Sequence, residues 1–399
     1  MTSRFHGVIA RRHLLFRPLN RHSMEMVKRG SAVKLCLHSR PIFCETDSGI
    51  ARSLMIAATT DEKVKVAIIG CGHWGPNHIR NFSSHKQAKA LYCVDLDPKR
   101  LEAARDLFPW VEATNDLERV LKDEHVQAVV IATPTATHFE LTKKALLAGK
   151  HVLCEKPLAA STAEAKELLA LAKQTGLVLM VGHVFLFNAG IVKLRELISS
   201  DELGRLYYLH ATRTNLGPIR QDVDCVWDLA THDISIFNYL LGGPPREVSG
   251  RGSSYLQDGK ADVAFITLTY PDQVLANIHI SWLDPKKVRQ VTVVGDRKMV
   301  SWDDMATSGS IMIYDKKVLR QAFYRDFGEF QLVTREGDVL IPRVRASEPL
   351  RVQTDYFISC VRAGKIDSCG PSDGLQVVRV LEAIQESMAA NGAPVPLPP

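Results

Sequence analysis

Two side chains near the middle of the chain have the types and the spacing that proton transfer requires. Asp228 and His232 are four residues apart, at the start of a segment whose apolar residues recur at helical spacing up to Gly242. On a helix this spacing places both side chains on one face, where a carboxylate can orient an imidazole and stabilise its protonated form. An imidazole with a pKa near neutrality can accept a proton from a hydroxyl group. Asp228 and His232 are therefore predicted to be catalytic, with His232 as the general base.

A lysine follows a predicted strand in the preceding part of the chain. Lys156 lies between Glu155 and Pro157, directly after the apolar run 151–154. In open α/β sheets the ligand crevice lies outside the carboxyl ends of the strands, so this lysine is expected at the crevice. An ammonium group there can stabilise the negative charge that develops on a substrate oxygen. Lys156 is therefore predicted to be catalytic and to contact the substrate together with His232.

A glycine-rich turn earlier in the chain predicts a dinucleotide site. The apolar run 64–69 leads directly into Gly70, Gly72 and Gly75, which have the spacing G-x-G-x-x-G. The first glycine allows a tight turn, the second lets backbone N–H groups approach a pyrophosphate, and the third lets the next helix pack closely on the sheet. The helix that opens at Pro76 would direct its free N–H groups and its positive end at that pyrophosphate.

Further cofactor contacts are expected where neighbouring strands end. Asp95 ends a predicted strand over 91–94, about 20 residues after the last glycine, where an acidic residue binds the ribose hydroxyls of NAD. Its charge repels a 2′-phosphate, so NAD is favoured over NADP, although Lys99 and Arg100 follow closely enough to offset the repulsion. The turn 133–138 ends another predicted strand at the same edge. The predicted cofactor-binding residues are Gly70, Gly72, His73, Trp74, Gly75, Asp95, Thr133, Pro134, His138, Glu155 and Lys156.

The order of the predicted elements indicates an α/β fold. After Asp95 the chain alternates strand and helix patterns, which is typical of a parallel sheet with helices on both faces. Beyond residue 200, partly alternating strands follow one another with few helices between them, which is typical of a largely antiparallel sheet. The expected elements are helices over 98–108, 116–122 and 139–148, strands over 126–132 and 151–154, and later strands over 206–213, 263–270, 274–282 and 291–294.

The composition argues against several classes of protein. The 399 residues carry a net charge of +6, but much of the excess is near the N-terminus, and no later basic stripe is interleaved with aromatic residues. Nucleic acid is therefore not expected as a partner. The eight cysteines show no C-x-x-C and no paired ligand spacing, so neither a metal site nor a disulfide framework is predicted. No stretch approaches 18 uninterrupted apolar residues, so no membrane span is expected.

The first 60 residues are considered apart from the fold. They are rich in Arg and Ser, poor in acidic residues and without sustained apolar periodicity, and they resemble a transit peptide for a mitochondrion or a plastid. The alternative is a disordered leader with no address, which would leave the protein in the cytoplasm. Pro18 and Pro41 limit any long amphipathic helix in this segment.

Three motifs occur in a fixed order: Gly-Cys-Gly-His-Trp-Gly-Pro-Asn-His, Ala-Thr-Pro-Thr-Ala-Thr-His and Cys-Glu-Lys-Pro-Leu-Ala. Together they resemble the Gfo/Idh/MocA oxidoreductases, from about Lys63 to the C-terminus. The resemblance implies a Rossmann domain over 61–182 and a C-terminal α+β domain over 183–399 with a large, mostly antiparallel sheet. It also implies a nicotinamide cofactor, oxidation or reduction of a sugar or polyol carbon, and assembly as a homodimer or homotetramer through that sheet. The family's catalytic lysine and its D-x-x-x-H pattern match Lys156, Asp228 and His232.

The substrate is indicated mainly by resemblance. The segment 182–188 and the D-x-x-x-H segment are most similar to the branch of the family that acts on nucleotide-linked amino sugars, typically at the sugar 3-hydroxyl group. Arg213, Asn215 and Arg220 lie between the first strand of the antiparallel sheet and the catalytic helix, where they either contact a diphosphate or carboxylate or are ordinary loop charges. Arg213 and Asn215 are predicted substrate contacts.

Several alternatives stay open at this point. Free sugars and inositol are alternative substrates. The same site would also serve glycoside hydrolysis through transient oxidation at C3. A third alternative is a catalytically silent regulator that binds the cofactor, but such a protein would be expected to have lost Lys156 or His232.

Overall fold

The computed structural model describes residues 62–322 and 330–398. Ala58–Pro399 is one compact unit. The prediction of a transit peptide over 1–60 lies outside the described residues, as do Cys36 and Cys44. The division of the chain at residue 182 stays a prediction.

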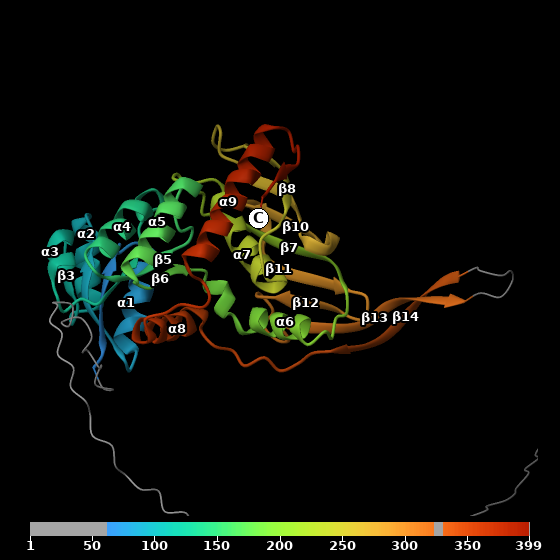
Figure 1. The fold of residues 1–399 in the computed structure, drawn as a ribbon, viewed down its shortest axis with the longest axis horizontal. Coiled ribbons are helices and arrows are strands. Elements are labelled where there is room, and N and C mark those ends of the chain that lie inside the picture. Colours follow the sequence, from blue (N-terminus) through green and yellow to red (C-terminus); the bar gives the residue numbers. More distant parts are fainter. Residues whose placement is uncertain (1–61, 323–329, 399) are drawn as a thin grey trace, which may run out of the picture. The chain divides into compact units, whose positions relative to one another are not determined.

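Six parallel strands form the first sheet, in the order β3-β2-β1-β4-β5-β6. This is the strand order of Rossmann dinucleotide-binding domains, in which the ligand crevice lies where the order reverses, between β1 and β4. This sheet and its helices form the blue and green part of the ribbon in Figure 1. Its strands are β1 (Val64–Ile69), β2 (Ala88–Val94), β3 (Glu112–Thr114), β4 (Ala128–Ile131), β5 (His151–Glu155) and β6 (Leu179–Gly182). The connecting helices are α1 (Gly75–Ser84), α2 (Pro98–Leu107), α3 (Leu117–Lys122), α4 (His138–Leu147) and α5 (Thr162–Thr175).

The predicted elements of this half are confirmed with small shifts at their ends. Side-chain caps explain why the helix starts were predictable: Asp97 accepts a hydrogen bond from the N–H of Lys99, and Asp116 accepts one from Arg119. Strand β3 was not predicted, because its three residues are too few for a period to show.

Nine strands form the second sheet, in the order β14-β13-β12-β11-β7-β10-β9-β8-β15. Only the central pair, β7 and β10, is parallel; every other neighbouring pair is antiparallel. The fold class is therefore as predicted, a Rossmann sheet followed by a mostly antiparallel one. The strands are β7 (Leu206–Leu216), β8 (Glu247–Ser253), β9 (Val263–Thr269), β10 (Leu275–Ser281), β11 (Leu283–Gly295), β12 (Met299–Asp303), β13 (Ile311–Ala322), β14 (Phe330–Leu340) and β15 (Val395–Pro396).

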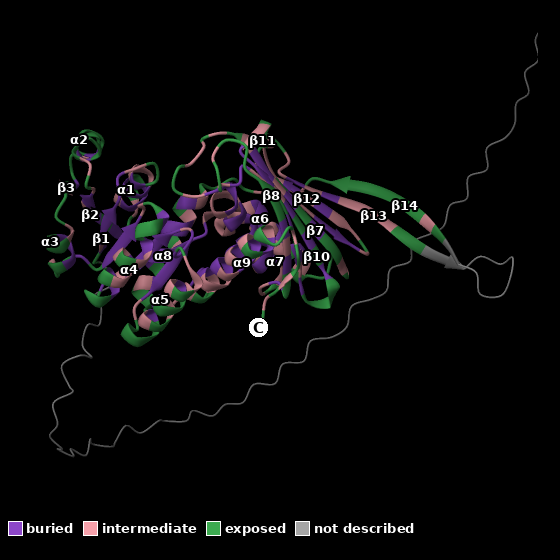
Figure 2. Cartoon of the chain, turned by 90° about the horizontal axis from the view of Figure 1, so that it is seen from above, coloured by how far each residue is buried: buried purple, intermediate pink, exposed green. Residues whose placement is uncertain are grey.

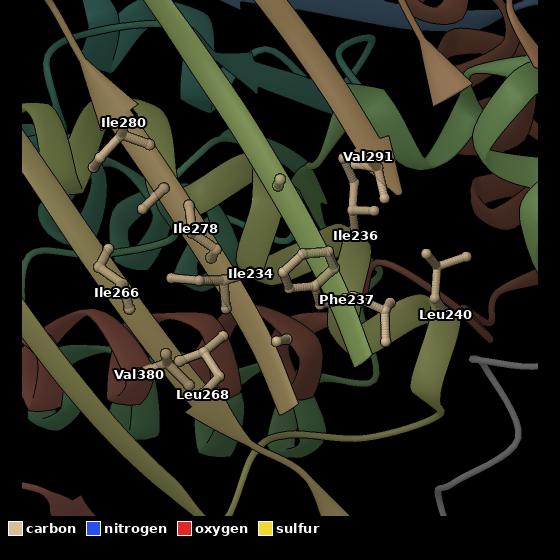
Figure 3. Packing of buried hydrophobic residues seen from close by; sticks show 14 of the residues in the cluster. Ile234, Ile236, Phe237, Leu240, Ile266, Leu268, Ile278, Ile280, Val291 and Val380 are labelled. Carbon is tan, nitrogen blue, oxygen red and sulfur yellow. The ribbon is translucent and has the colours of Figure 1, made fainter. Parts of the chain in front are cut away.

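Helices pack on one face of this second sheet. They are α6 (Ala189–Ser199), α7 (Thr231–Leu241) and α9 (Pro371–Ala389), while α8 (Pro349–Ala363) packs on the Rossmann half. In Figure 3 Ile234 and Phe237 of α7 lie against the aliphatic side chains of the sheet, such as Ile266 and Ile278. Gly242, whose φ is +80°, ends α7 as predicted. This core holds α7, and with it His232, in a fixed position.

The other face of the second sheet presents aromatic side chains to the outside. Tyr208, Phe265 and Leu275 are 45%, 55% and 49% exposed, and Phe265 stacks on His279 with ring centroids 4.5 Å apart. In Figure 2 most of β14 is likewise coloured as exposed. Among the described residues, no helix is long and apolar enough to cross a membrane, and no group of three or more His, Cys, Asp or Glu side chains is placed to hold a metal ion.

Candidate active site

The glycine-rich turn has the backbone geometry of a dinucleotide cradle. Gly70 has a φ of +97°, and a Cβ at this position would lie 2.6 Å from the carbonyl oxygen of Ala132. A Cβ at Gly75 would overlap the carbonyl oxygen of Gly70. Around Gly72 only the Arg100 guanidinium comes within 4 Å of the Cβ position, so a ligand can approach the backbone there. No side chain caps the start of α1, which leaves its first N–H groups free for an anion.

Asp95 is fixed beside this turn. Its Oδ2 accepts a hydrogen bond from the backbone N–H of Cys71 at 2.7 Å, and its Oδ1 accepts one from Asp97 at 2.9 Å. Arg100 Nη1 lies 3.7 Å from Asp95 Oδ2, which is the proximity that the sequence suggested. A carboxylate in this place fits the ribose hydroxyls of NAD.

His138 joins two loops at the edge of the Rossmann sheet. Its ring nitrogens lie 2.7 Å from the carbonyl oxygen of Pro157 and 3.0 Å from that of Thr133. Burial favours the neutral ring, but Cys154 and these two carbonyl groups outweigh it and raise the pKa of His138 to about 9. His138 therefore holds the loop that carries Lys156 against the turn that contains Thr133. Glu155 is also engaged internally, since its Oε1 lies 2.8 Å from His78 Nε2.

One cavity of about 1300 Å³ collects side chains from both sheets. It exceeds the roughly 300–1,000 Å³ typical of small-ligand sites, so it has room for a large substrate. The predicted site residues that line it are His73, Trp74, Lys156, Arg213, Asn215, Asp228 and His232. The predicted residues outside its lining are Gly70, Gly72, Gly75, Asp95, Thr133, Pro134, His138 and Glu155.

Lys156 and Asp228 are hydrogen-bonded to each other at the wall of this cavity. Lys156 Nζ donates to the carbonyl oxygen of Asp228 at 2.8 Å and to its Oδ1 at 3.3 Å. The Asp228 carboxylate also accepts from Arg220 Nη1 at 3.1 Å and from Trp282 Nε1 at 3.4 Å. Burial disfavours the ionised carboxylate, but the charges of Lys156 and Arg220 outweigh it and lower the pKa of Asp228. Asp228 therefore fixes the ammonium group at the cavity wall.

The predicted contact between Asp228 and His232 is wrong. Within the described part of the chain no hydrogen bond joins the two side chains, and the carboxylate faces Lys156 and Arg220 instead. The cause is the local helix geometry: Val226–Ala230 forms a π-helical turn, and α7 begins only at Thr231. The two residues are therefore not one regular α-helical turn apart.

His232 has a strongly electropositive surrounding. Its Nδ1 is buried and has no hydrogen-bond partner among the described residues, and its ring lies edge-on to Phe185 with centroids 4.9 Å apart. Burial, followed by the charges of Lys156, Arg213 and other nearby cations, lowers the pKa of His232 well below its usual value. The expected stabilisation of the protonated form is therefore reversed. The neutral imidazole that results is the form that accepts a proton.

Arg213 lines the cavity but is engaged in an internal ion pair. Its Nε and Nη2 donate to the two carboxylate oxygens of Asp233 at 2.9 Å and 2.8 Å, and both residues are buried. The guanidinium carbon lies 4.4 Å from the ring centroid of Phe185. Arg213 thus orients Phe185 and adds positive charge near His232. A direct contact between Arg213 and the substrate stays a prediction.

The two other polar residues of this segment are placed differently. Asn215 lines the cavity, and its side-chain amide donates to the carbonyl oxygen of Gly217. Arg220 lies outside the cavity lining and pairs with Asp222 as well as with Asp228. Its role is to hold the Asp228 carboxylate, which the sequence did not indicate.

Among the cavity residues that were not predicted as site residues, four make contacts that shape the site. Phe185 is the aromatic surface on which both Arg213 and Arg289 lie. Lys287 is exposed at the cavity, and Arg289 pairs with Asp304 at 3.2 Å. Trp282 bonds Asp228. No short-range signal indicates these residues, because their places depend on distant segments: Lys287 and Arg289 lie on β11, Trp282 lies between β10 and β11, and Phe185 lies in the segment after β6.

Comparisons with known proteins agree with this geometry. The chain matches the model of an oxidoreductase family with an NAD-binding Rossmann fold over residues 64–183 and that of the GFO/IDH/MocA C-terminal domain over residues 191–301. It is 31% identical to UDP-N-acetylglucosamine 3-dehydrogenase of Acidithiobacillus ferrooxidans, over 80% of this chain and 95% of that protein. It is 29% identical to inositol 2-dehydrogenase 2 of Paenarthrobacter aurescens, over 82% of this chain and 97% of that protein.

A solved structure shows the same arrangement. GenD2 from gentamicin A biosynthesis, solved in complex with NAD, superposes with a TM-score of 0.72 at 25% identity, over 85% of this chain and 97% of that chain. The glycine cradle and the fixed Asp95 fit this cofactor, and the two matched family models together cover more than half of the chain. The chain therefore belongs to the Gfo/Idh/MocA oxidoreductases, a family with an NAD-binding Rossmann domain.

Proposed function

We propose that the protein is a dehydrogenase that transfers a hydride between NAD and a secondary hydroxyl carbon, C3 of a nucleotide-linked amino sugar, with His232 as base. The observation that carries this proposal is the shared lining of one cavity. Lys156 and His232 line the same space as His73 and Trp74 of the glycine-rich turn. A substrate carbon held between them would therefore lie next to the cofactor.

The residues of the site supply the proton and charge steps. When bound, NAD would be held by the glycine-rich turn and Asp95 and would supply the acceptor for the hydride of the carbinol carbon. His232, neutral because its pKa is lowered, takes the hydroxyl proton. Lys156 holds the oxygen and stabilises the negative charge that grows on it. Asp228 keeps the ammonium group in place through the hydrogen bonds to its own carbonyl and carboxylate oxygens.

The choice of a nucleotide-linked amino sugar rests on the relative of that name and on the charge of the cavity. UDP-N-acetylglucosamine 3-dehydrogenase aligns along most of both chains. Lys287 is an exposed cation on the cavity wall, and Arg289 lies beside it. Two cations near each other suit a diphosphate, which a free sugar or inositol lacks.

The test is a substrate panel with two measurements. UDP-N-acetylglucosamine, UDP-glucose, myo-inositol and free hexoses are incubated with the protein and NAD, and NADH absorbance and thermal shift are recorded. We expect NADH formation and NAD-dependent stabilisation with the UDP-amino sugar, because a ligand that binds only the native state raises its apparent stability. Lys287→Ala should weaken binding of the UDP-sugar and leave binding of myo-inositol unchanged.

Other outcomes would contradict parts of the proposal. NADH formation with inositol alone would leave the dehydrogenase chemistry intact and replace the substrate class. Release of free sugar from a glycoside without net NADH would indicate the hydrolase chemistry instead. Full turnover by His232→Ala would show that His232 is not the base.

A further inference from the structure

A second cavity, of about 260 Å³, lies between α6, α7 and the start of α9. Its lining shares no residue with the catalytic cavity. The buried residue His183, which follows β6, forms part of its wall, and the exposed residues Gly242 and Asp367 lie at its other side. The cavity therefore extends from the interior to solvent.

Three buried polar atoms in this wall lack a protein partner. Both ring nitrogens of His183 and the Nδ2 of Asn238 are without a hydrogen bond among the described residues. His183 is 1% exposed and Asn238 is 9% exposed. Native proteins satisfy such groups with ordered water when the space is polar and large enough. This cavity is large enough for several water molecules.

Helix α7 leads from the catalytic cavity to the second one. His232 lines the first cavity, while Ser235 and Asn238 line the second. Ser235 follows His232 by one turn, and Asn238 follows Ser235 by one turn, so the helix leads from one cavity toward the other. Ser235 Oγ also donates to the carbonyl oxygen of His232 at 2.7 Å. The ring Nδ1 of His232 has no partner among the described residues, so it is available to donate a proton toward the second cavity.

His183 lies close to the catalytic residues, because it is two residues before Phe185, whose ring packs edge-on against that of His232 with centroids 4.9 Å apart. The charged groups near His183 include Glu155 and Lys156, and Arg195, Asp367 and Asp373 line the same cavity. Those near His232 include Lys156, Arg213 and Arg289. Three of the groups around His232 are cations, so a full positive charge on this ring is unfavourable. A base in this place works best if it gives up one proton while it takes another.

We propose that the second cavity holds a cluster of water molecules, and that this water and His183 carry a proton between His232 Nδ1 and bulk solvent while the cleft is occupied. The inference rests on the proposed role of His232 as base. As His232 Nε2 takes the hydroxyl proton, Nδ1 gives its own proton to the path, and the outermost water releases one to solvent, so the ring stays neutral. No electrons move along the path. After product leaves, Nε2 loses its proton to water in the open cleft and Nδ1 takes one back.

The test is chemical rescue of a cavity variant. His183→Ala should keep its NAD affinity and lose about 10²-fold in kcat for alcohol oxidation, the usual contribution of a proton-transfer group. Added imidazole, which can enter the open cavity, should restore turnover with saturation. His183→Asn keeps a hydrogen-bonding side chain but cannot relay a proton, so it should be as slow. Gln376→Ala is the matched control, because this side chain lines the same cavity and has no unpartnered buried atom.

Three results would overturn the relay. The first is an unchanged kcat in folded His183→Ala, and the second is full activity of His183→Asn. The third is a crystal structure in which no water contacts His183 or Asn238. If His232→Ala abolishes turnover while the His183 variants remain active, only the relay is wrong. If His232→Ala remains active, the proposed function itself fails.

Discussion

Substitution of one partner in the buried Arg213–Asp233 ion pair should destabilise the fold strongly. The two side chains are 4% and 2% exposed, and the pair is bidentate. Asp233→Asn keeps the shape of the side chain, removes its charge and leaves the guanidinium uncompensated. Breaking a buried pair in this way costs about 3–5 kcal/mol. With a urea slope of about 3 kcal/mol/M, the unfolding midpoint should fall by about 1–1.7 M.

Two further variants make this measurement specific. Glu167→Gln removes the partner of Lys143 in an exposed ion pair and should leave the midpoint unchanged, because surface pairs contribute little. The double variant Arg213→Met/Asp233→Leu removes both charges and should recover most of the lost stability. A midpoint shift in Asp233→Asn no larger than that in Glu167→Gln would refute the reasoning.

Four other outcomes are expected. Protonated His138, with a pKa raised from 6.5 to about 9, should stabilise the fold at low pH, and this contribution should disappear as pH rises from 6.5 through about 9. In urea titrations the free energy of unfolding should therefore fall across this range in wild type and not in His138→Gln. NAD should bind more tightly than NADP in titrations, and Asp95→Ala should reduce the difference; tighter NADP binding by wild type would contradict the role of Asp95. Lys156→Ala and His232→Ala should each bind NAD normally and lose about 10²-fold or more in turnover; loss of NAD binding would show that the roles are misassigned. Light scattering should give the mass of a homodimer or homotetramer, because the outer face of the second sheet exposes Tyr208, Phe265 and Leu275; a monomer at micromolar concentration would exclude assembly through this sheet.

The parts of the structure that the sequence predicted are those set by local rules. The glycine turn follows from the positions at which no Cβ fits, and Gly70 and Gly75 are of this kind. Helix ends follow from caps, such as Asp97 at the start of α2 and Gly242 at the end of α7. The carboxyl edge of a parallel sheet is also a local property, and for this reason Lys156 could be placed at the crevice.

Other features depend on contacts between distant segments. The partner of Asp228 is Lys156, 72 residues away, and the π-helical turn that directs it there has the same short-range pattern as an α-helix. From the sequence, Arg213 could be an ordinary loop charge. In the structure it lies on β7, where it is paired with Asp233. Strands β13 and β14 were not predicted, because the described part of β14 is mostly exposed and carries no buried alternation.

The bond between Lys156 and Asp228 has a mechanical consequence. Lys156 follows a strand of the Rossmann sheet, and Asp228 precedes the helix that packs on the other sheet, so this ion pair is also a latch between the two halves of the cleft. Any hinge motion that widens the cleft must break the latch and withdraw the ammonium group from its place. In such a motion, entry of a ligand and readiness for chemistry would be opposed, because a widened cleft would hold the cation out of position.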